Sequence, residues 1–471
     1  MKNPLSTLLV LSLLATQLVA AKPNIVLVMA DDQGWGDMAY NGHPVVRTPN
    51  FDKAAATGLR FDRFYAAAPV CSPTRAAVMT GRHPNRMGVF KWGYPMRPQE
   101  TTIAEALKTA GYTSGHFGKW HLGSVRNSSD AHPGRNGFDD WLSAPNFYDN
   151  DPILSHKGKA VPIKGESSVI AAEAALKWMK KVSKTKQPFL CVVWFGSPHG
   201  PFVATEEFRK LYDDQPPASQ HFLGEISGMD HAFGLIRNGL KSMGVSDNTI
   251  LWYTSDNGAL KKVGSAGPFR GKKGQVYEGG LLVPAILEWP KVIKENRIAD
   301  ARCNSCDIYP TLLEIAGVKM KKQAPLDGVS LLQLIKGGEL RKNRSMGFWD
   351  YPIKGIGTPA AAWMKELFDA QQAGRDLPPR DIVPPAAKLP EPPVAVDSFP
   401  GHSAWVEGDW KLHRVQDKKG KVSWRFYNLA VDPSETTDLV ATEGQRIHHY
   451  RGKLENWLES VARSLNGEDY R

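Results

Sequence analysis

The chain contains few cysteines for its length, only four among 471 residues. Folds that depend on disulfides are much richer in cysteine, so a disulfide framework is excluded. Cys303 and Cys306 form a single Cys-x-x-Cys motif, and no second pair of ligands stands at a spacing suited to zinc. We expect either a local disulfide or two unreactive thiols there. Cys191, inside a very apolar run, is expected to be buried in a strand.

Long apolar runs are also scarce. The apolar stretch at residues 8–14 is too short to cross a membrane, and no later stretch is apolar enough, so we expect no stable membrane insertion. Lys2 before this stretch and the small residues 19–21 after it are typical of a secretory signal peptide. We therefore expect residues 1–21 to be cleaved off near Ala21 and the protein to be exported, to the periplasm or out of the cell.

Acidic residues are in the minority, with 48 Asp and Glu against 59 Lys and Arg and a net charge of +11. A basic protein can bind nucleic acid, but the sequence shows no nucleic-acid-binding motif, and we expect no such partner. A positive surface also attracts polyanionic substrates. For an exported protein this second explanation fits better.

The chain is long enough for a large core and too long for one average domain. Apolar runs typical of buried strands alternate with stretches typical of helices. The expected strands cover residues 24–30, 112–117, 188–195, 249–254 and 281–289, and the expected helices 102–111, 168–181, 221–243 and 307–316. This alternation predicts an α/β fold with a large mixed, mostly parallel sheet sandwiched by helices.

The C-terminal part has a different pattern, which predicts a smaller α+β domain over residues 401–471. Its expected elements are antiparallel strands and a closing helix, at residues 403–406, 410–413, 424–429 and 446–465. Residues 346–400 are rich in proline and alanine. We expect them to form an extended excursion that either lines a substrate cleft or serves only as a loop.

The stretch 71–82 has the pattern of a helix start. Pro73 suits a first helical position, and Ser72, held extended before a proline, can cap the helix. Cys71 would then lie just outside the helix N-terminus, where free amide groups and the helix dipole attract an anion. Arg75, one turn later, could hold an oxyanion with two parallel hydrogen bonds. Taken alone, Cys71 could equally be a small buried hydrophobic residue.

Polar residues follow the predicted strands at their carboxyl ends, where open α/β sheets bind ligands. Asp31 and Asp32 follow the first strand, and Asp256 and Asn257 follow the strand at 249–254. Oxygen donors without a cluster of thiolates or imidazoles suit a hard cation, calcium or magnesium. Each pair alone could be a cap or a turn, but the occurrence of both pairs at strand ends favours a metal site.

Lys119, His121, His199 and Lys273 are candidates for charge stabilisation and proton transfer. Each of them alone could be a surface charge or a histidine that is hydrogen-bonded in a loop. Lys119 and His199 also stand at strand ends. They could therefore share one site with the aspartates, although they lie far apart in the sequence.

Together these motifs resemble the type I sulfatases of the alkaline phosphatase superfamily, and among them the arylsulfatase A and N-acetylgalactosamine-6-sulfatase types. The matching motifs lie at residues 29–32, 71–82, 118–123, 197–199, 255–258, 270–274, 277–280, 408–412, 427–429 and 432–435. The Cys-x-Pro-x-Arg and Thr-Gly-Arg elements of 71–82 are the most specific. The Arg-Gly-x-Lys-Gly segment indicates Lys273 rather than Lys272 as the active-site lysine. The proline-rich segment has no match.

The resemblance implies an alkaline phosphatase-like fold, a catalytic domain at residues 22–345, and hydrolysis of a sulfate ester, which we expect to be that of a sulfated carbohydrate. It also implies that a formylglycine-forming maturation enzyme oxidises Cys71 to Cα-formylglycine. The aldehyde would hydrate to a geminal diol, and one hydroxyl would attack sulfur and expel the alcohol. Sulfate would leave as the second hydroxyl loses its proton and the aldehyde reforms.

The same resemblance implies roles for the candidate residues. The implied ligands of Ca²⁺, with Mg²⁺ less favoured, are Asp31, Asp32, Cys71, Asp256 and Asn257. Arg75, Lys119 and Lys273 would place positive charge around the sulfate. His199 would protonate the leaving oxygen, and His121 would act as the base that collapses the diol.

Two other hypotheses remain. A phosphatase or phosphodiesterase of the same superfamily would commonly use Ser or Thr with zinc bound by Asp and His, unlike the residues found here. A non-catalytic binder of sulfated polysaccharide, with Cys71 never oxidised, is compatible with the basic charge. Trp405, His402 and Tyr351 could shape a sugar subsite or could equally be packing residues.

Overall fold

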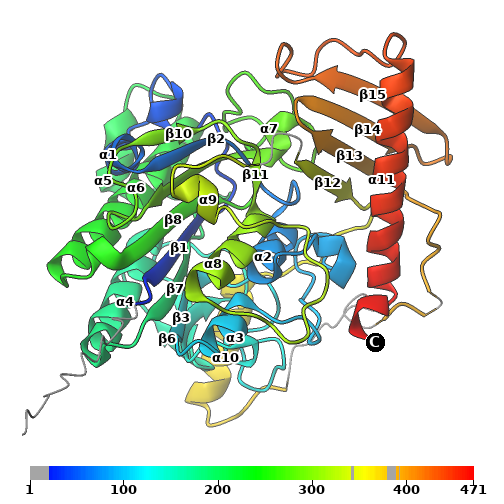
Figure 1. Cartoon of the computed structure of the whole chain (residues 1–471). Coiled ribbons are helices and arrows are strands. Elements are labelled where there is room, and N and C mark those ends of the chain that lie inside the picture. The colour runs from blue at the N-terminus through cyan, green and yellow to red at the C-terminus, as the bar shows by residue number, and fades with distance from the viewer. Residues whose placement is uncertain (1–20, 341–343, 379–388, 392) are drawn as a thin grey trace, which may run out of the picture.

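The computed structural model describes residues 21–340, 344–378, 389–391 and 393–471 (Figure 1). The signal peptide expected at residues 1–21 therefore lies, apart from Ala21, outside the described residues. Within the described part of the chain, no helix is both long enough and apolar enough to span a membrane.

A sheet of eleven strands forms the centre of the larger part of the molecule. Its central strands are β1 (Asn24–Ala30), β7 (Phe189–Trp194), β8 (Thr249–Ser255), β3 (Thr113–Lys119) and β4 (Asp140–Ala144). β1 pairs in parallel with β7 and β8, and β3 pairs in parallel with β7 and β4. Because these strands run in one direction, their carboxyl ends meet at one edge of the sheet.

The outer strands make the sheet mixed. β9 (Leu282–Glu288) runs antiparallel to both β8 and β2 (Leu59–Tyr65). The short strands β10 (Arg297–Ala299) and β11 (Cys303–Asn304) pair with β2, and β5 (Ile153–His156) and β6 (Lys159–Pro162) form a hairpin at the opposite edge. The expected α/β fold with a large mixed, mostly parallel sheet is confirmed.

Helices cover both faces of the sheet. Along β1, Ile25, Leu27 and Met29 belong to one buried core, while Val26 and Val28 belong to the core on the other face. This alternation follows from the two-residue period of a strand, and burial on both faces explains why the strand is continuously apolar. The first core includes α2 (Cys71–Thr80), α3 (Ile103–Lys108) and α8 (Ile308–Ala316), and the second includes α1 (Pro49–Thr57), α4 (Ser167–Val182) and α6 (Pro217–Ser242).

The C-terminal part contains the expected smaller α+β unit. Its antiparallel sheet consists of β12 (Ser345–Asp350), β13 (His402–Glu407), β14 (Trp410–Gln416) and β15 (Val422–Asn428). Helix α11 (Gly444–Leu465) packs across one face of this small sheet (Figure 1).

The proline-rich segment contains elements that its composition did not predict. β12 opens the segment, and α10 (Ala360–Gln372) lies beside β5 and β6. This helix covers an alanine-rich stretch between Pro359 and Gly374, whereas the paired prolines all come later. Averaging the composition over residues 346–400 therefore hid a short helix-forming stretch.

Candidate active site

The candidate site lies at the edge of the large sheet where the central strands end. Asp31 and Asp32 follow β1, Lys119 ends β3 and Asp256 follows β8, and all of these side chains are buried. His199 comes from the loop after β7. Parallel pairing of these strands thus brings together residues that are far apart in the sequence.

Asp31, Asp32 and Asp256 form an acidic cluster, in which one carboxylate oxygen of each lies within 4.8 Å of the others. Asn257 joins them, its Nδ2 donating to Asp32 Oδ1 at 2.8 Å. Asp31 Oδ1 and Asn257 Oδ1 are buried and have no hydrogen-bond partner among the described residues. A buried oxygen without a donor is costly, and a divalent cation bound between the carboxylates would satisfy both. The expected oxygen donors therefore fit a hard cation.

Arg75 and Lys119 face this acidic cluster. Arg75 donates to Asp256 Oδ2 from Nε at 3.0 Å and from Nη2 at 2.6 Å, and its guanidinium lies 5.1 Å from the centre of the Trp194 ring. Lys119 Nζ donates to Asp31 Oδ2 at 2.6 Å. Both cationic side chains are buried, so their charges act across a low-dielectric environment.

Lys273, and not Lys272, reaches the acidic cluster. Lys273 Nζ donates to Asp32 Oδ2 at 2.7 Å. Lys272 Nζ donates instead to the Gly264 carbonyl oxygen at 2.6 Å. Each carboxylate of the cluster is thus paired with a cationic side chain.

The charged groups of the cluster change one another's pKa. Burial raises the pKa of Asp31 to about 8 despite the nearby Lys119. Burial acts on Asp32 in the same direction, but Lys273 and His199 outweigh it and hold the pKa of Asp32 below its usual range. A bound cation would favour the ionised form of both carboxyl groups.

Cys71 is the first residue of α2 and does not lie outside it, so the predicted cap at Ser72 is wrong. Val70, in an extended conformation, occupies the cap position, and the Ser72 hydroxyl accepts a hydrogen bond from Gly93 N at 2.9 Å. Pro73 is therefore the third helical residue. It is tolerated there because the first four amide groups of a helix have no partner within the helix.

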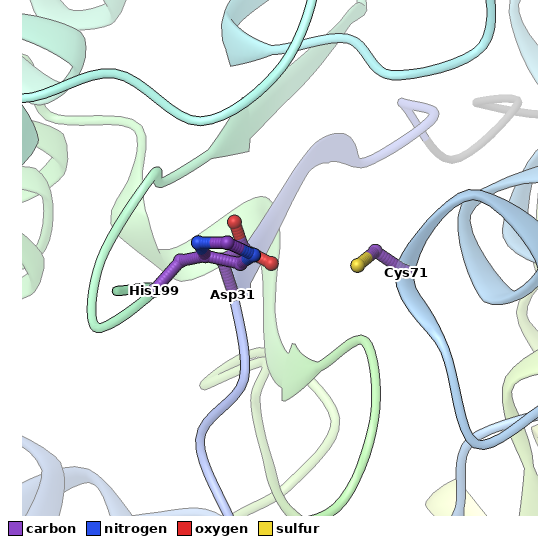
Figure 2. Close-up of side chains that lie close together, drawn as sticks. All are labelled: Asp31, Cys71 and His199. Carbon is purple, nitrogen blue, oxygen red and sulfur yellow. The ribbon is translucent and has the colours of Figure 1, made fainter. Parts of the chain in front are cut away.

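The Cys71 side chain points towards Asp31 and His199 (Figure 2), and its Sγ lies within 4.8 Å of a ligand atom of each. Burial raises the pKa of the thiol to about 11, and Lys119 and Lys273 offset this only in part. An unmodified Cys71 is therefore a neutral thiol at pH 7. The thiolate, not the thiol, is the nucleophilic form of cysteine.

His199 has a defined ring orientation. Its Nδ1 lies 2.7 Å from the Gly200 carbonyl oxygen and so donates a hydrogen, while Nε2 lies 3.6 Å from Asp32 Oδ2. Phe147 stacks on the ring with 4.2 Å between the centroids. Burial lowers the pKa of His199 to about 4, and Asp32 offsets this only in part. An anionic substrate beside the ring would raise this pKa because it favours the protonated form.

His121 is buried, with its backbone in the left-handed region at a φ of 55°. Its Nε2 lies 3.4 Å from Thr358 Oγ1, and for its Nδ1 the described residues provide no partner. Burial, together with the positive charges of Lys119 and Arg75, lowers the pKa of His121 well below its ordinary value. The ring is thus neutral at pH 7, the state in which a histidine can take up a proton.

Asn146, Phe147 and Thr358 also lie at the candidate site, although the sequence did not predict them there. Asn146 Nδ2 donates to Thr358 Oγ1 at 2.7 Å beside His121, and Phe147 stacks on His199. Asn146 and Phe147 follow the carboxyl end of β4, which is the signal that could have identified them had β4 been predicted. Thr358 lies in the proline-rich segment, where no motif marks it.

The aromatic residues considered for a sugar subsite have packing partners. Trp405, Tyr351 and His402 lie against Trp457, Phe90 and His413, with ring-centroid distances of 6.2, 4.7 and 5.0 Å. These contacts favour the packing alternative.

The remaining cysteines are buried and form no disulfide. Of the two alternatives for Cys303 and Cys306, the structure therefore has two free thiols. Burial raises the pKa of both, which keeps them protonated and unreactive.

Comparison with known proteins agrees with this geometry. The profile of the Sulfatase family matches residues 23–318, more than half of the chain. The N-acetylgalactosamine-6-sulfatase of Mus musculus is 33% identical over 383 residues, which cover 71% of this chain and 70% of that protein. Arylsulfatase A of Homo sapiens is 32% identical over 390 residues, which cover 74% of this chain and 75% of that protein.

Solved structures share the fold. The structure of Ps i-CgsB in complex with k-i-k-neocarrahexaose has a TM-score of 0.77 at 24% identity and covers 95% of this chain and 98% of its own. A phosphonate monoester hydrolase of Agrobacterium radiobacter has a TM-score of 0.64 at 20% identity and covers 94% of this chain and 96% of its own. The family profile and the curated relatives go further than the fold: this chain belongs to the sulfatase family and is a sulfuric ester hydrolase.

Proposed function

We propose that this sulfatase is exported and removes sulfate from a sulfated carbohydrate, using formylglycine formed from Cys71 and a divalent cation, Ca²⁺ in preference to Mg²⁺. The observation that carries the proposal is the position of Cys71. It begins α2, faces the acidic cluster and is close enough to Lys119, Lys273 and Arg75 for their charges to act on a group at this position. Residue 71 therefore lies beside the groups that would bind a metal ion and an anionic ester.

The choice of a carbohydrate substrate rests on similar proteins and on charge. The curated relatives include N-acetylgalactosamine-6-sulfatase. A structure solved in complex with its substrate D-glucosamine-2-N,6-O-disulfate has a TM-score of 0.67 to this chain at 20% identity. The net charge of +11 would attract a polyanionic glycan. Export rests on the N-terminal sequence pattern alone.

Asp31, Asp32, Asp256 and Asn257 would hold the cation through oxygen atoms, with residue 71 beside them. A cation bound there neutralises charge on the sulfate oxygens and lowers the pKa of a nearby hydroxyl group. Formylglycine, once hydrated, supplies an oxygen nucleophile for sulfur and a second hydroxyl group, whose deprotonation releases sulfate.

Charged side chains and two histidines would stabilise the developing charge and transfer protons. Arg75, Lys119 and Lys273 hold the sulfate and stabilise the negative charge that develops as the bond from sulfur to the leaving oxygen breaks. His199, protonated once the anionic ester is bound, donates its Nε2 proton to that oxygen. His121 takes the proton from the remaining hydroxyl group of residue 71. The overall reaction consumes one water and yields an alcohol and sulfate.

The maturation enzyme is expected to act before the fold closes. All ten residues of α2 are buried, including Cys71, Pro73 and Arg75 of the recognition motif. A second enzyme could not reach Cys71 in the folded protein.

The proposal is tested by turnover of matched esters. The protein and its Cys71→Ala variant are produced with a formylglycine-forming enzyme and assayed on sulfate and phosphate monoesters of the same alcohols. We expect hydrolysis of the sulfate esters by the wild type and none by folded Cys71→Ala. Faster turnover of the phosphate esters would indicate a phosphatase. Tight binding of sulfated polysaccharide without turnover would indicate a non-catalytic binder.

A further inference from the structure

The motifs at 408–412 and 432–435 resemble the sulfatase family but have no role in the chemistry described so far. They supply Lys411 and Glu435, which are fully buried and contact the buried Glu278. Glu278 begins α7 (Glu278–Leu281), the short helix that lies next to the small sheet (Figure 1). Because buried charges are costly unless paired, their presence between the two parts of the molecule requires a physical reason.

These charged side chains form one connected network. Lys411 Nζ donates to Glu278 Oε1 at 2.7 Å and lies 3.2 Å from Glu435 Oε1. Glu435 Oε2 accepts a hydrogen bond from the backbone N of Glu278 at 2.6 Å. His413 Nε2 lies 2.6 Å from Glu435 Oε1, and the Tyr65 hydroxyl donates to Glu278 Oε2 at 2.7 Å. Every carboxylate oxygen in the network therefore has a partner.

The network holds one end of the loop that carries Lys273. Glu278 is followed by Gly279, whose N donates to the Arg270 carbonyl oxygen at 2.7 Å, so residues 270–279 form a closed loop. The Arg270 side chain donates to the Glu435 carbonyl oxygen at 2.8 Å. Glu435 therefore binds this loop at two points, one on each side of Lys273.

The same loop contacts the backbone beside the nucleophile and the metal ligands. Gly274 N donates to the carbonyl oxygen of Pro69, two residues before position 71, at 2.8 Å. Gly258, directly after Asn257, donates its N to the Gly280 carbonyl oxygen at 3.0 Å. The backbone is tightly packed here, since a Cβ at Gly280 would lie 2.0 Å from a neighbouring carbonyl oxygen. A displacement of the loop would therefore also shift the backbone next to residue 71 and Asn257.

We propose that Glu435 is a positioning residue of the active site: from the C-terminal part of the chain it fixes the 270–280 loop so that Lys273 reaches Asp32. Lys411 offsets the negative charge of Glu435 and Glu278. The inference rests on the proposed function, because that function assigns Lys273 to the sulfate. Through this positioning role, the C-terminal motifs would contribute to catalysis without contacting the substrate.

The test compares Glu435→Gln with Glu407→Gln in the full-length enzyme. Glu407 is the control, because it is also a glutamate of the C-terminal part paired with a lysine, Lys453, at 2.6 Å, although its side chain is 14% exposed and that of Glu435 is fully buried. The side-chain partners of Glu407 lie in the small sheet or α11 and are Ser345, Trp405 and Lys453. We expect kcat/KM to fall about tenfold in Glu435→Gln, because small misplacements of a charged group lower turnover strongly, and to stay near the wild-type value in Glu407→Gln.

Two further readouts separate positioning from a general loss of stability. If Glu435 acts through Lys273, Glu435→Gln causes little further loss of turnover in a Lys273→Ala background. Amide hydrogen exchange of residues 270–280 is expected to speed up in Glu435→Gln while that of α4 stays unchanged. Equal losses in both backgrounds, or unchanged exchange in residues 270–280, would overturn the proposal.

The exchange measurement does not require turnover. An inactive wild type would therefore count against the proposed function, whereas unchanged exchange would count against the role of Glu435. Should Glu435→Gln fail to fold, Arg270→Gln removes the second link between the loop and residue 435. The same readouts then apply to that variant.

Discussion

At the scale of single residues, Arg75, Lys119 and Lys273 each hold a carboxylate of the acidic cluster before any substrate is bound. Charge that is already in place stabilises a transition state without reorganisation during the reaction. A divalent cation bound among the same carboxylates would leave the site with a positive net charge. Such a site favours an anionic ester over a neutral one.

Replacing His199 with Gln tests its assignment as the acid. Glutamine keeps a polar side chain but cannot transfer a proton, so kcat/KM for a sugar sulfate is expected to fall by about 10²- to 10⁴-fold. An aryl sulfate is expected to lose much less, because a phenolate leaves without being protonated. The kcat/KM values for the two substrates are measured on the same preparation. Incomplete formation of formylglycine therefore lowers both values equally and does not change their ratio. Equal losses on the two substrates would contradict the assignment.

The residue types of the candidate site could be predicted because a hard cation and an anionic ester favour particular side chains, and the predicted strand ends indicated where those side chains gather. Local hydrogen bonding could not be predicted in the same way. The Ser72 hydroxyl pairs with Gly93, 21 residues away, and so does not cap its own helix. Thr358 reaches His121 from a segment without any motif.

Among the structural elements, β1 and β8 bring the proposed metal ligands together, and Asn257→Ala tests this arrangement. Ca²⁺ is expected to raise the midpoint of thermal unfolding of the wild type, because a ligand that binds only the folded state stabilises it. The rise is expected to be clearly smaller in Asn257→Ala, which loses an oxygen donor but keeps the carboxylates. Thermal unfolding at increasing Ca²⁺, with a parallel Mg²⁺ series, measures both. Asn238→Ala, on the exposed surface of α6, is the control, and an equal rise in the two variants would contradict the site.

The elements that could be predicted were those with a strong pattern, such as β1 and β7, which are apolar on both faces. An apolar run shows that a strand is buried but not its direction, so the antiparallel course of β9 was not foreseen. β4 alternates between buried and partly exposed residues over only five positions, which left its pattern too weak to recognise.

At the scale of the whole molecule, Asp327 links α11 to the segment after α2. It accepts hydrogen bonds from Arg86 Nε at 2.7 Å, from His83 N at 2.7 Å and from Trp457 Nε1 at 3.0 Å. Burial alone would raise the pKa of Asp327, but Arg86 outweighs it and holds this pKa well below its usual range. A pKa lowered in the folded state stabilises the fold above the pKa of the unfolded chain, and this stabilisation is lost as the pH falls.

We therefore expect Asp327→Asn to lower the free energy of unfolding by about 3 kcal/mol at pH 7, as for a broken buried ion pair. The difference from the wild type is expected to shrink as the pH falls below about 4, because Asp327 then takes up a proton in the unfolded chain while it stays ionised in the folded protein. Urea unfolding at a series of pH values measures this difference. A difference that stays constant over the whole range would show that the charge of Asp327 is not responsible.

The contacts between the two parts of the molecule could not be predicted from the sequence. Glu278 and Glu435 are 157 residues apart, and neither of the motifs that contain them indicates that the two residues are in contact. Only the folded chain shows that the C-terminal motifs pack against the loop that carries Lys273.

Residue 71 is proposed to act as formylglycine, and mass spectrometry of the peptide containing this residue detects that conversion. The protein is produced with and without a formylglycine-forming enzyme. We expect a residue in which an aldehyde oxygen replaces the Cys71 thiol, and sulfatase activity in proportion to its abundance. Unmodified Cys71 in protein made with the maturation enzyme, whether that protein is active or not, would rule out formylglycine as the nucleophile.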